Sequence, residues 1–303
     1  MALRLRDHWI WDHWILTGDD HLDLFFLRAS RALHDPFRRH FRASIGHAVS
    51  HDDGATWQLL PDALVHADAP AFDDRACWTG SAIRHPDGFI RLFYTGISHG
   101  DGGRLVQRIG WADSRDGVTF TRMSRPPLEA DPRWYAVPGD ADVNWRDPFV
   151  FRHEGRWHMV ITASAAGAPP GYGGVIGHAV SDDLETWQVR EPLTEPSRFR
   201  HLECSQVRRI DGTDYLVFSC GATMLVDPSQ GSVWVAKGES PLGPFDLAGA
   251  RYVSPDHLYA GQLFQDTSAQ WWFTGFDSVD DTNFPGVVAD PIAWRDLELR
   301  TPA

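Results

Sequence analysis

Cysteine is scarce in this sequence, and long apolar runs and an excess of basic residues are both missing. The three cysteines, Cys77, Cys204 and Cys220, form no CxxC pair, which argues against a disulfide framework and a zinc site. The first twenty residues alternate apolar and charged groups, so we expect neither a signal peptide nor a membrane span, and a cytoplasmic location. The fifteen histidines are scattered without an HExxH-type pair, so we expect no metal and no cofactor.

The charge balance is acidic, with 41 Asp and Glu against 28 Lys and Arg and a net charge of −13. A nucleic acid or an anionic membrane would approach such a surface against repulsion, so we expect neither as a partner. Apolar residues make up 43% of the chain and charged residues 23%, which is enough apolar material for a folded core. These values predict a soluble globular protein and leave its oligomeric state open.

A repeated segment is the main organising feature of the sequence. Each copy has a β-rich run with small residues, then Ser or Asp, a turn and an aromatic residue. The copies start 55 to 67 residues apart, so the 303 residues hold about five of them. Their first residues are Ile45, Ile109, Ile176, Val233 and Val288.

Two further strand-like segments precede each copy, and a short strand follows it. Four antiparallel strands repeated five times predict an all-β fold, a five-bladed β-propeller with four strands per blade. We expect residues 1–303 to form one such catalytic domain with no C-terminal β-sandwich, and residues 2–6 to be able to pair with the last blade. Insertions at 31–43 and 125–144 are too long for hairpin turns and are expected to decorate the binding face.

Recurring residues outside the first strands are expected to be structural. Asp52, Asp116 and Asp183 recur in the turn before the outer strand, where carboxylates cap backbone N–H groups. Trp57 and Trp187 recur at one blade position together with Trp294, and we expect all three to pack in the core.

The first strand of each propeller blade lines the central axis, so polar residues at matching positions converge there. In chain order these positions hold Asp12, Gly80 and Ser81, Asp147, Glu203 and Gln262. When three carboxylates share one cavity, their repulsion raises the pKa of at least one of them. A general acid at neutral pH requires such a raised pKa. The sequence therefore predicts a catalytic cluster.

Three motifs resemble the signatures of the five-bladed furanosidase clan, glycoside hydrolase families 32 and 68, which contains invertases, inulinases and levansucrases. They are Trp11-Asp12-His13-Trp14, Arg146-Asp147-Pro148 and Glu203-Cys204, and the segments starting at Trp78 and Leu92 are similar to further family elements. The resemblance spans residues 9 to about 210. It implies a retaining hydrolase that cleaves a terminal, non-reducing furanoside, such as the β-D-fructofuranoside of sucrose or a short fructo-oligosaccharide, through a covalent intermediate.

The resemblance also implies a role for each acid. Asp12 corresponds to the nucleophile, Glu203 to the acid/base, and Asp147 to the residue that holds ring hydroxyls. We expect Arg146 to keep Asp147 ionised, and the apolar neighbours of Glu203 to keep it protonated. Asp7 lies in a tandem copy of the Asp12 segment; the odd spacing places the two on opposite faces, and we choose Asp12.

The remaining substrate-binding candidates are mostly aromatic, because an indole covers the C–H face of a sugar. They are Trp14, Trp78, Ser81, Trp145, Arg146 and Gln262. Two alternatives stay open: an inverting arabinofuranosidase of the related family 43, and a propeller that binds carbohydrate without catalysis.

Overall fold

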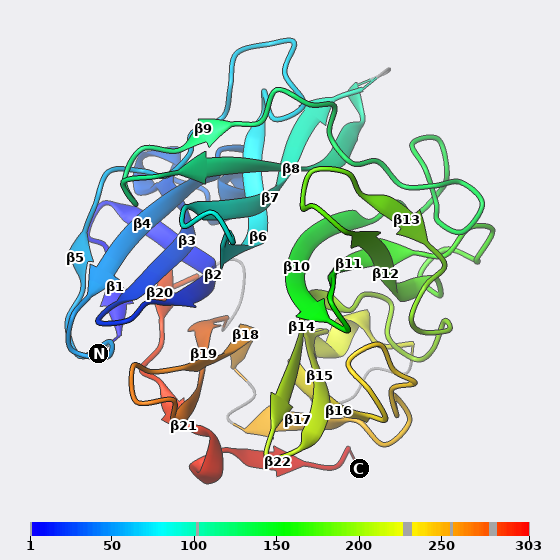
Figure 1. Ribbon diagram of the computed structural model, residues 1–303. Helices are drawn as coiled ribbons and strands as arrows, with labels where there is room; N and C mark the ends of the chain where they lie inside the picture. Colours follow the sequence, from blue (N-terminus) through cyan, green and yellow to red (C-terminus); the bar gives the residue numbers. More distant parts are fainter. Residues whose placement is uncertain (1, 101–102, 227–231, 255–256, 279–283, 303) are drawn as a thin grey trace.

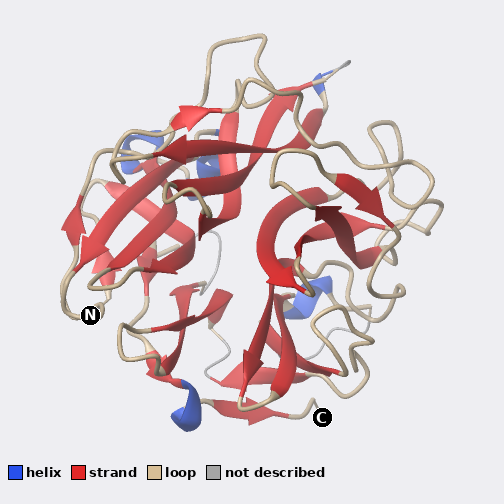
Figure 2. Ribbon diagram, in the orientation of Figure 1, coloured by secondary structure: helices blue, strands red, loops and turns tan. Residues whose placement is uncertain are grey.

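Among the residues that the structure describes, strands form nearly all the regular structure, and helix is limited to short 3-10 turns (Figure 2). The computed structural model describes residues 2–100, 103–226, 232–254, 257–278 and 284–302. The short helical turns are η1 (Arg31–Leu33), η2 (Pro36–Phe41), η4 (Ala222–Met224) and η5 (Trp294–Asp296). Within these residues, no helix is long and apolar enough to cross a membrane.

Five antiparallel sheets surround a central axis, which confirms the predicted five-bladed propeller (Figure 1). The first three sheets have four strands each, in chain order. Blade one holds β2 (His8–Thr17), β3 (Leu22–Ser30), β4 (Ser44–Ser50) and β5 (Gln58–Leu59). Blade two holds β6 (Ala76–Arg84), β7 (Ile90–His99), β8 (Leu105–Ser114) and β9 (Thr121–Arg122). Blade three holds β10 (Trp145–His153), β11 (Arg156–Ser164), β12 (Gly174–Ser181) and β13 (Gln188–Arg190).

The last two blades depart from the four-strand pattern. Blade four holds β14 (Glu203–Ile210), β15 (Thr213–Ser219), β16 (Val233–Gly238), β17 (Arg251–Ser254) and an added outer strand, β22 (Glu298–Arg300). Blade five holds β18 (Leu258–Gln265), β19 (Trp271–Asp277), β20 (Val287–Val288), β21 (Ile292–Ala293) and β1 (Leu3–Arg4). Leu3 pairs with Val288, so the N-terminal strand closes the ring, as residues 2–6 were expected to do.

The recurring aspartates fill the structural role predicted for them. Asp116 accepts hydrogen bonds from the backbone N–H groups of Val118 and Thr119, and Asp183 accepts two in the same way. Asp52 accepts from the backbone N–H of Thr56 at 2.8 Å. These bonds lower the pKa of all three carboxyls and fix the turn that leads to the outer strand.

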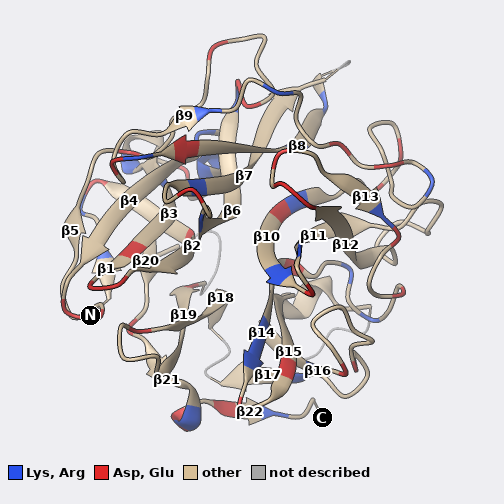
Figure 3. Cartoon of the chain, viewed as in Figure 1, with Lys and Arg blue, Asp and Glu red and all other residues tan. Residues whose placement is uncertain are grey.

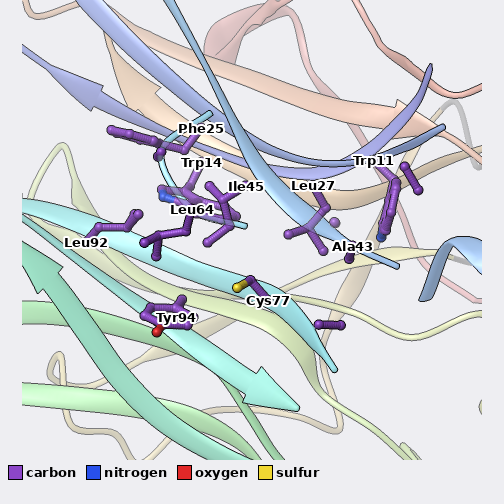
Figure 4. Packing of buried hydrophobic residues seen from close by; sticks show 14 of the residues in the cluster. Trp11, Trp14, Phe25, Leu27, Ala43, Ile45, Leu64, Cys77, Leu92 and Tyr94 are labelled. Carbon is purple, nitrogen blue, oxygen red and sulfur yellow. The ribbon is translucent and has the colours of Figure 1, made fainter. Parts of the chain in front are cut away.

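Apolar side chains fill the spaces between neighbouring blades. The cluster between blades one and two includes Trp11, Trp14, Phe25 and Tyr94, and Trp11 and Trp14 lie toward opposite ends of the interface (Figure 4). Trp57, Trp187 and Trp294 pack against three other apolar clusters, as predicted for core residues.

A β-bulge interrupts the innermost strand of every blade at an equivalent place. The ladder of β2 skips Asp12, and that of β6 skips Thr79. The breaks in β10, β14 and β18 likewise follow Arg146, Glu203 and Tyr259. A bulge places an extra residue on one strand and re-aims its side chain, so five bulges turn one ring of side chains toward one end of the axis.

Candidate active site

A pocket of about 620 Å³ lies at the end of the axis toward which the bulged residues point. All five innermost strands contribute to its wall, together with the segments around η2 and η4. Its polar lining comprises Asp12, Arg39, His40, Thr79, Gln107, Arg146, Asp147, Glu203, Cys204, Thr223, Ser232, Tyr259 and Ser278. The pocket therefore brings the three predicted carboxylates together.

Asp12 lies at the bulge of β2 and keeps part of its surface exposed to the pocket. The hydroxyl of Thr79 donates a short hydrogen bond to Oδ2, and Sγ of Cys204 lies 3.7 Å from the same oxygen. Burial and then the charge of Asp147 raise the pKa of Asp12 to about 7, although the Thr79 bond opposes them. Asp7, its counterpart in the tandem copy, has an 80% exposed side chain, which is consistent with the choice of Asp12.

Asp147 is held more rigidly. Its backbone lies in the left-handed region with φ of 57°, and its N–H donates to the hydroxyl oxygen of Thr95 at 2.9 Å. Oδ2 lies 2.9 Å from the hydroxyl of Thr162 and accepts from the N–H of Cys204 at 3.1 Å. A non-glycine residue in this conformation costs on the order of 1 kcal/mol, and such strain is commonly found at functional sites.

Glu203 is the acid that Arg146 contacts most closely. Nη2 of Arg146 lies 2.6 Å from Oε1 of Glu203, whereas Nε lies 3.7 Å from Oδ2 of Asp147. The hydroxyl of Tyr259 donates a short hydrogen bond to Oε2, and Nδ1 of His201 lies 3.6 Å from Oε1. Figure 3 shows acidic and basic segments on β10, and a basic segment on β14, the strand that begins at Glu203.

The protonated state expected for Glu203 from the sequence is wrong for the free site. Burial raises the pKa of Glu203, but His201, Arg146 and Tyr259 outweigh it and hold that pKa below its usual range. Burial raises the pKa of Asp147, with Arg146 opposing it. Near neutral pH the proton is therefore on Asp12, whose pKa is raised by burial and by the charge of Asp147, whereas Arg146 and its other partners keep Glu203 ionised.

Two of the predicted substrate-binding residues line the pocket with the acids. They are Arg146 and Trp78, whose indole N–H donates to the carbonyl oxygen of His40 at 2.7 Å. His40 and Arg39 belong to the insertion at 31–43, so this insertion reaches the binding face, as expected.

The other four candidates lie elsewhere. Trp14, Ser81 and Gln262 line a second hollow, and Trp145 is 1% exposed and packs on Tyr135 with ring centroids 4.9 Å apart. Trp14, Ser81 and Gln262 come after the bulges of their strands, so they lie farther along the axis than the residues of the catalytic pocket. Thr79 and Tyr259 accordingly occupy the places that we assigned to Ser81 and Gln262.

Sequence reasoning missed several pocket residues for lack of a local signal. Gln107, Tyr259, Arg39 and His40 belong to no motif with chemical meaning of its own, and Thr79 lies unnoticed in the segment that starts at Trp78. A polar or aromatic residue directly before each bulge is the one common pattern. Across the described ranges, no group of three or more His, Cys, Asp or Glu residues is arranged to hold a metal ion.

Comparison with known proteins identifies the family. The family described as "Glycosyl hydrolases family 32 N-terminal domain" matches residues 34–288. The chain belongs to glycosyl hydrolase family 32. The match contains Asp147 and Glu203, whereas Asp12 lies ahead of its first residue.

Two curated proteins are similar to this chain at moderate identity. Sucrose-6-phosphate hydrolase of Bacillus subtilis is 30% identical over 61% of this chain and 36% of its own length. Raffinose invertase of Escherichia coli is 30% identical over 57% of this chain and 34% of its own length. This family 32 chain spans little more than a third of the relatives that it matches.

Solved structures share the propeller over nearly the whole chain. An inulosucrase from Halalkalicoccus jeotgali bound to kestose aligns with a TM-score of 0.76 at 21% identity, covering 98% of this chain and 88% of the other. The catalytic domain of a β-fructofuranosidase from Microbacterium saccharophilum aligns with a TM-score of 0.73 at 19% identity, covering 95% and 78%. These similarities concern the fold.

Proposed function

We propose that this family 32 chain is a retaining glycoside hydrolase that releases fructose from the non-reducing end of short β-D-fructofuranosides. The convergence of Asp12, Asp147 and Glu203 from three blades on one pocket carries this proposal. A pocket of about 620 Å³ suits a disaccharide or a short oligosaccharide. Family membership favours a fructoside over the arabinofuranoside alternative.

In the proposed reaction, Asp12 attacks the anomeric carbon while Glu203 protonates the leaving oxygen. Glu203 then takes a proton from water, and the hydroxide attacks the fructosyl-Asp12 ester. Asp147, fixed by Thr162 and the backbone N–H of Cys204, accepts hydrogen bonds from ring hydroxyls. Trp78 offers an indole face beside the sugar.

This mechanism requires the proton to lie on Glu203 when the substrate reacts. Asp12 and Glu203 share one proton near neutral pH, and the free site places it on Asp12. A bound sugar displaces water and brings its leaving oxygen to Glu203, which favours transfer of the proton to that side. The one-proton form of the pair is the active form of the enzyme, and it reacts when that proton lies on Glu203 and Asp12 is ionised.

The test is sugar release by the purified protein from sucrose, sucrose 6-phosphate, kestose and an aryl arabinofuranoside. We expect fructose release that falls by at least about 10³-fold in Asp12→Asn, because no nucleophile remains. Asp7→Asn, the same change in the exposed tandem copy, is the matched control and should keep full activity. Proton NMR of the first anomer released checks retention.

Three other results would contradict the proposal in distinct ways. Arabinose release with inversion indicates the family 43 chemistry. Equal activity of Asp12→Asn and the wild type removes Asp12 from the reaction. Sugar binding by both proteins without turnover indicates a propeller that only binds.

A further inference from the structure

A second hollow of about 570 Å³ opens at the far end of the propeller axis. It is lined by later residues of the innermost strands, such as Thr17, Arg84 and Phe151, whereas the acids of the catalytic pocket come earlier in those strands. Trp14, Ser81 and Gln262, which the proposed reaction does not use, all face this hollow. The two openings therefore occupy opposite ends of one axis.

Arg208 of β14 is the partly buried cation of this hollow. Among the described residues, no carboxylate lies within 4 Å of its guanidinium, and its Nε donates to Oε1 of Gln206 at 3.3 Å. Burial lowers the pKa of Arg208 to about 10, and no acidic neighbour opposes this shift. In contrast, the adjacent Arg209 is exposed and forms a 2.6 Å ion pair with Asp214.

Aromatic rings hold the Arg208 guanidinium in place. Its central carbon lies 4.6 Å from the ring centroid of Phe149 and 6.0 Å from that of Trp271. Contact with two rings fixes the plane of the group and leaves its N–H edges available for an oxyanion. Phe264 and Trp14 extend the apolar wall of the same hollow.

The acid in the hollow does not neutralise this cation. Asp266 accepts from the backbone N–H groups of Ser268 and Gln270 and from the indole N–H of Trp272, so both of its oxygens are engaged within its own turn. Arg84 lines the rim, with Nη2 3.8 Å from Oδ2 of Asp23. In a chain of net charge −13, the hollow is thus a local site of positive charge.

We propose that this hollow binds a small organic oxyanion, a carboxylate or phosphate monoester with an apolar body, through the guanidinium of Arg208. The oxyanion accepts hydrogen bonds from the N–H groups of Arg208, and the apolar body lies against Trp14 and Phe264. This site is separate from the catalytic pocket and does not depend on the function proposed for it.

The test is isothermal titration of the full chain with benzoate and with phenyl phosphate, with uncharged benzyl alcohol as the reference. We expect saturable binding of at least one anion in the millimolar range or tighter, and weaker binding of benzyl alcohol. Arg208→Gln should weaken anion binding by at least about tenfold, since it removes a charge-assisted hydrogen bond. Arg209→Gln, the matched change one residue along, should leave binding unchanged.

NMR of the tryptophan indole groups locates the ligand without relying on a folded Arg208 variant. The signals of Trp14 and Trp271 should shift on titration, while those of Trp11 and Trp78 in the catalytic pocket stay in place. Three results would each overturn the proposal. They are shifts at Trp78 instead, an anion affinity of Arg208→Gln equal to that of the wild type, and no binding of either anion at 10 mM. That concentration is about tenfold above the weakest dissociation constant expected. None of these results bears on the proposed release of fructose, which is tested separately.

Discussion

The guanidinium of Arg146 lies 2.6 Å from the carboxylate of Glu203, so the arginine of blade three neutralises the acid of blade four. Its own neighbour in the sequence, Asp147, is 3.7 Å away. This geometry leaves Asp12 as the carboxyl that holds the site's proton near neutral pH.

Activity should decline above about pH 7. The reactive Asp12 and Glu203 pair carries one proton, and the upper pKa of the pair is the value of about 7 at Asp12. We expect kcat/KM for fructose release to fall about tenfold per pH unit above that value. Thr79→Val removes the hydroxyl that lowers the Asp12 pKa, so the decline should shift to higher pH. A flat profile up to pH 9 would contradict this assignment.

The Asp12→Asn variant should be more stable than the wild type. The pKa of Asp12 rises from 3.8 to about 7 on folding, so its cost to stability grows between these values and is constant above them. We expect a gain in the free energy of unfolding of roughly 2 to 4 kcal/mol at pH 8, and less than half of it at pH 5. Urea unfolding at both pH values measures it. A gain that is independent of pH would show that the charge is not its cause.

Gly80 is required by the bulge beside Thr79. A Cβ at Gly80 would lie 1.8 Å from the carbonyl oxygen of Phe93, and backbone cannot move aside cheaply. Gly80→Ala should therefore lower stability by about 3 kcal/mol and displace Thr79 from Asp12. The comparison is Gly88→Ala, where a Cβ meets nothing within 4 Å and only the φ of 86° opposes it, at a cost of about 1 kcal/mol. Thermal unfolding measures both losses, and an equal fall in Tm for the two variants would refute this role of Gly80.

Leu3 should contribute measurably to ring closure. It is 8% exposed and packs with Ile10, Phe26 and Val288, so Leu3→Ala removes contacts that join the first and last blades. We expect a loss of about 2 kcal/mol and a fall in Tm of about 3–6 °C. Leu59→Ala, at a 48% exposed outer position, is the control and should change Tm by less than 1 °C, within about 0.5 kcal/mol. A similar Tm for both variants would mean that β1 adds little to stability.

The sequence was sufficient for the fold because its period repeats locally. Alternating apolar residues recur in each blade, and Ser-x-Asp turns at Ser50, Ser114 and Ser181 mark the first three, so these units specify the same four-strand sheet. It was not sufficient for the outer strands of the last two blades. The pairing of β22 with β17 joins segments with no shared pattern, so only packing determines it.

The site was predictable in its acids but less so in its surroundings. Motifs identified Asp12, Asp147 and Glu203, whereas the assignment of Ser81 and Gln262 assumed regular alternation through the strands. Bulges shift that alternation, and their positions depend on backbone pairing that single residues do not encode. The ion pair between Arg146 and Glu203 crosses blades, so the position of the proton could not be read from chain neighbours.

Closure of the ring by β1 also constrains how the chain folds. Leu3 is synthesised 285 residues before its partner Val288. Blades one to three can form as their residues leave the ribosome, while β1 must wait unpaired until β20 emerges. The entropy of closing this long loop is lost in that last step, so blade five should form late and set the slow phase of refolding.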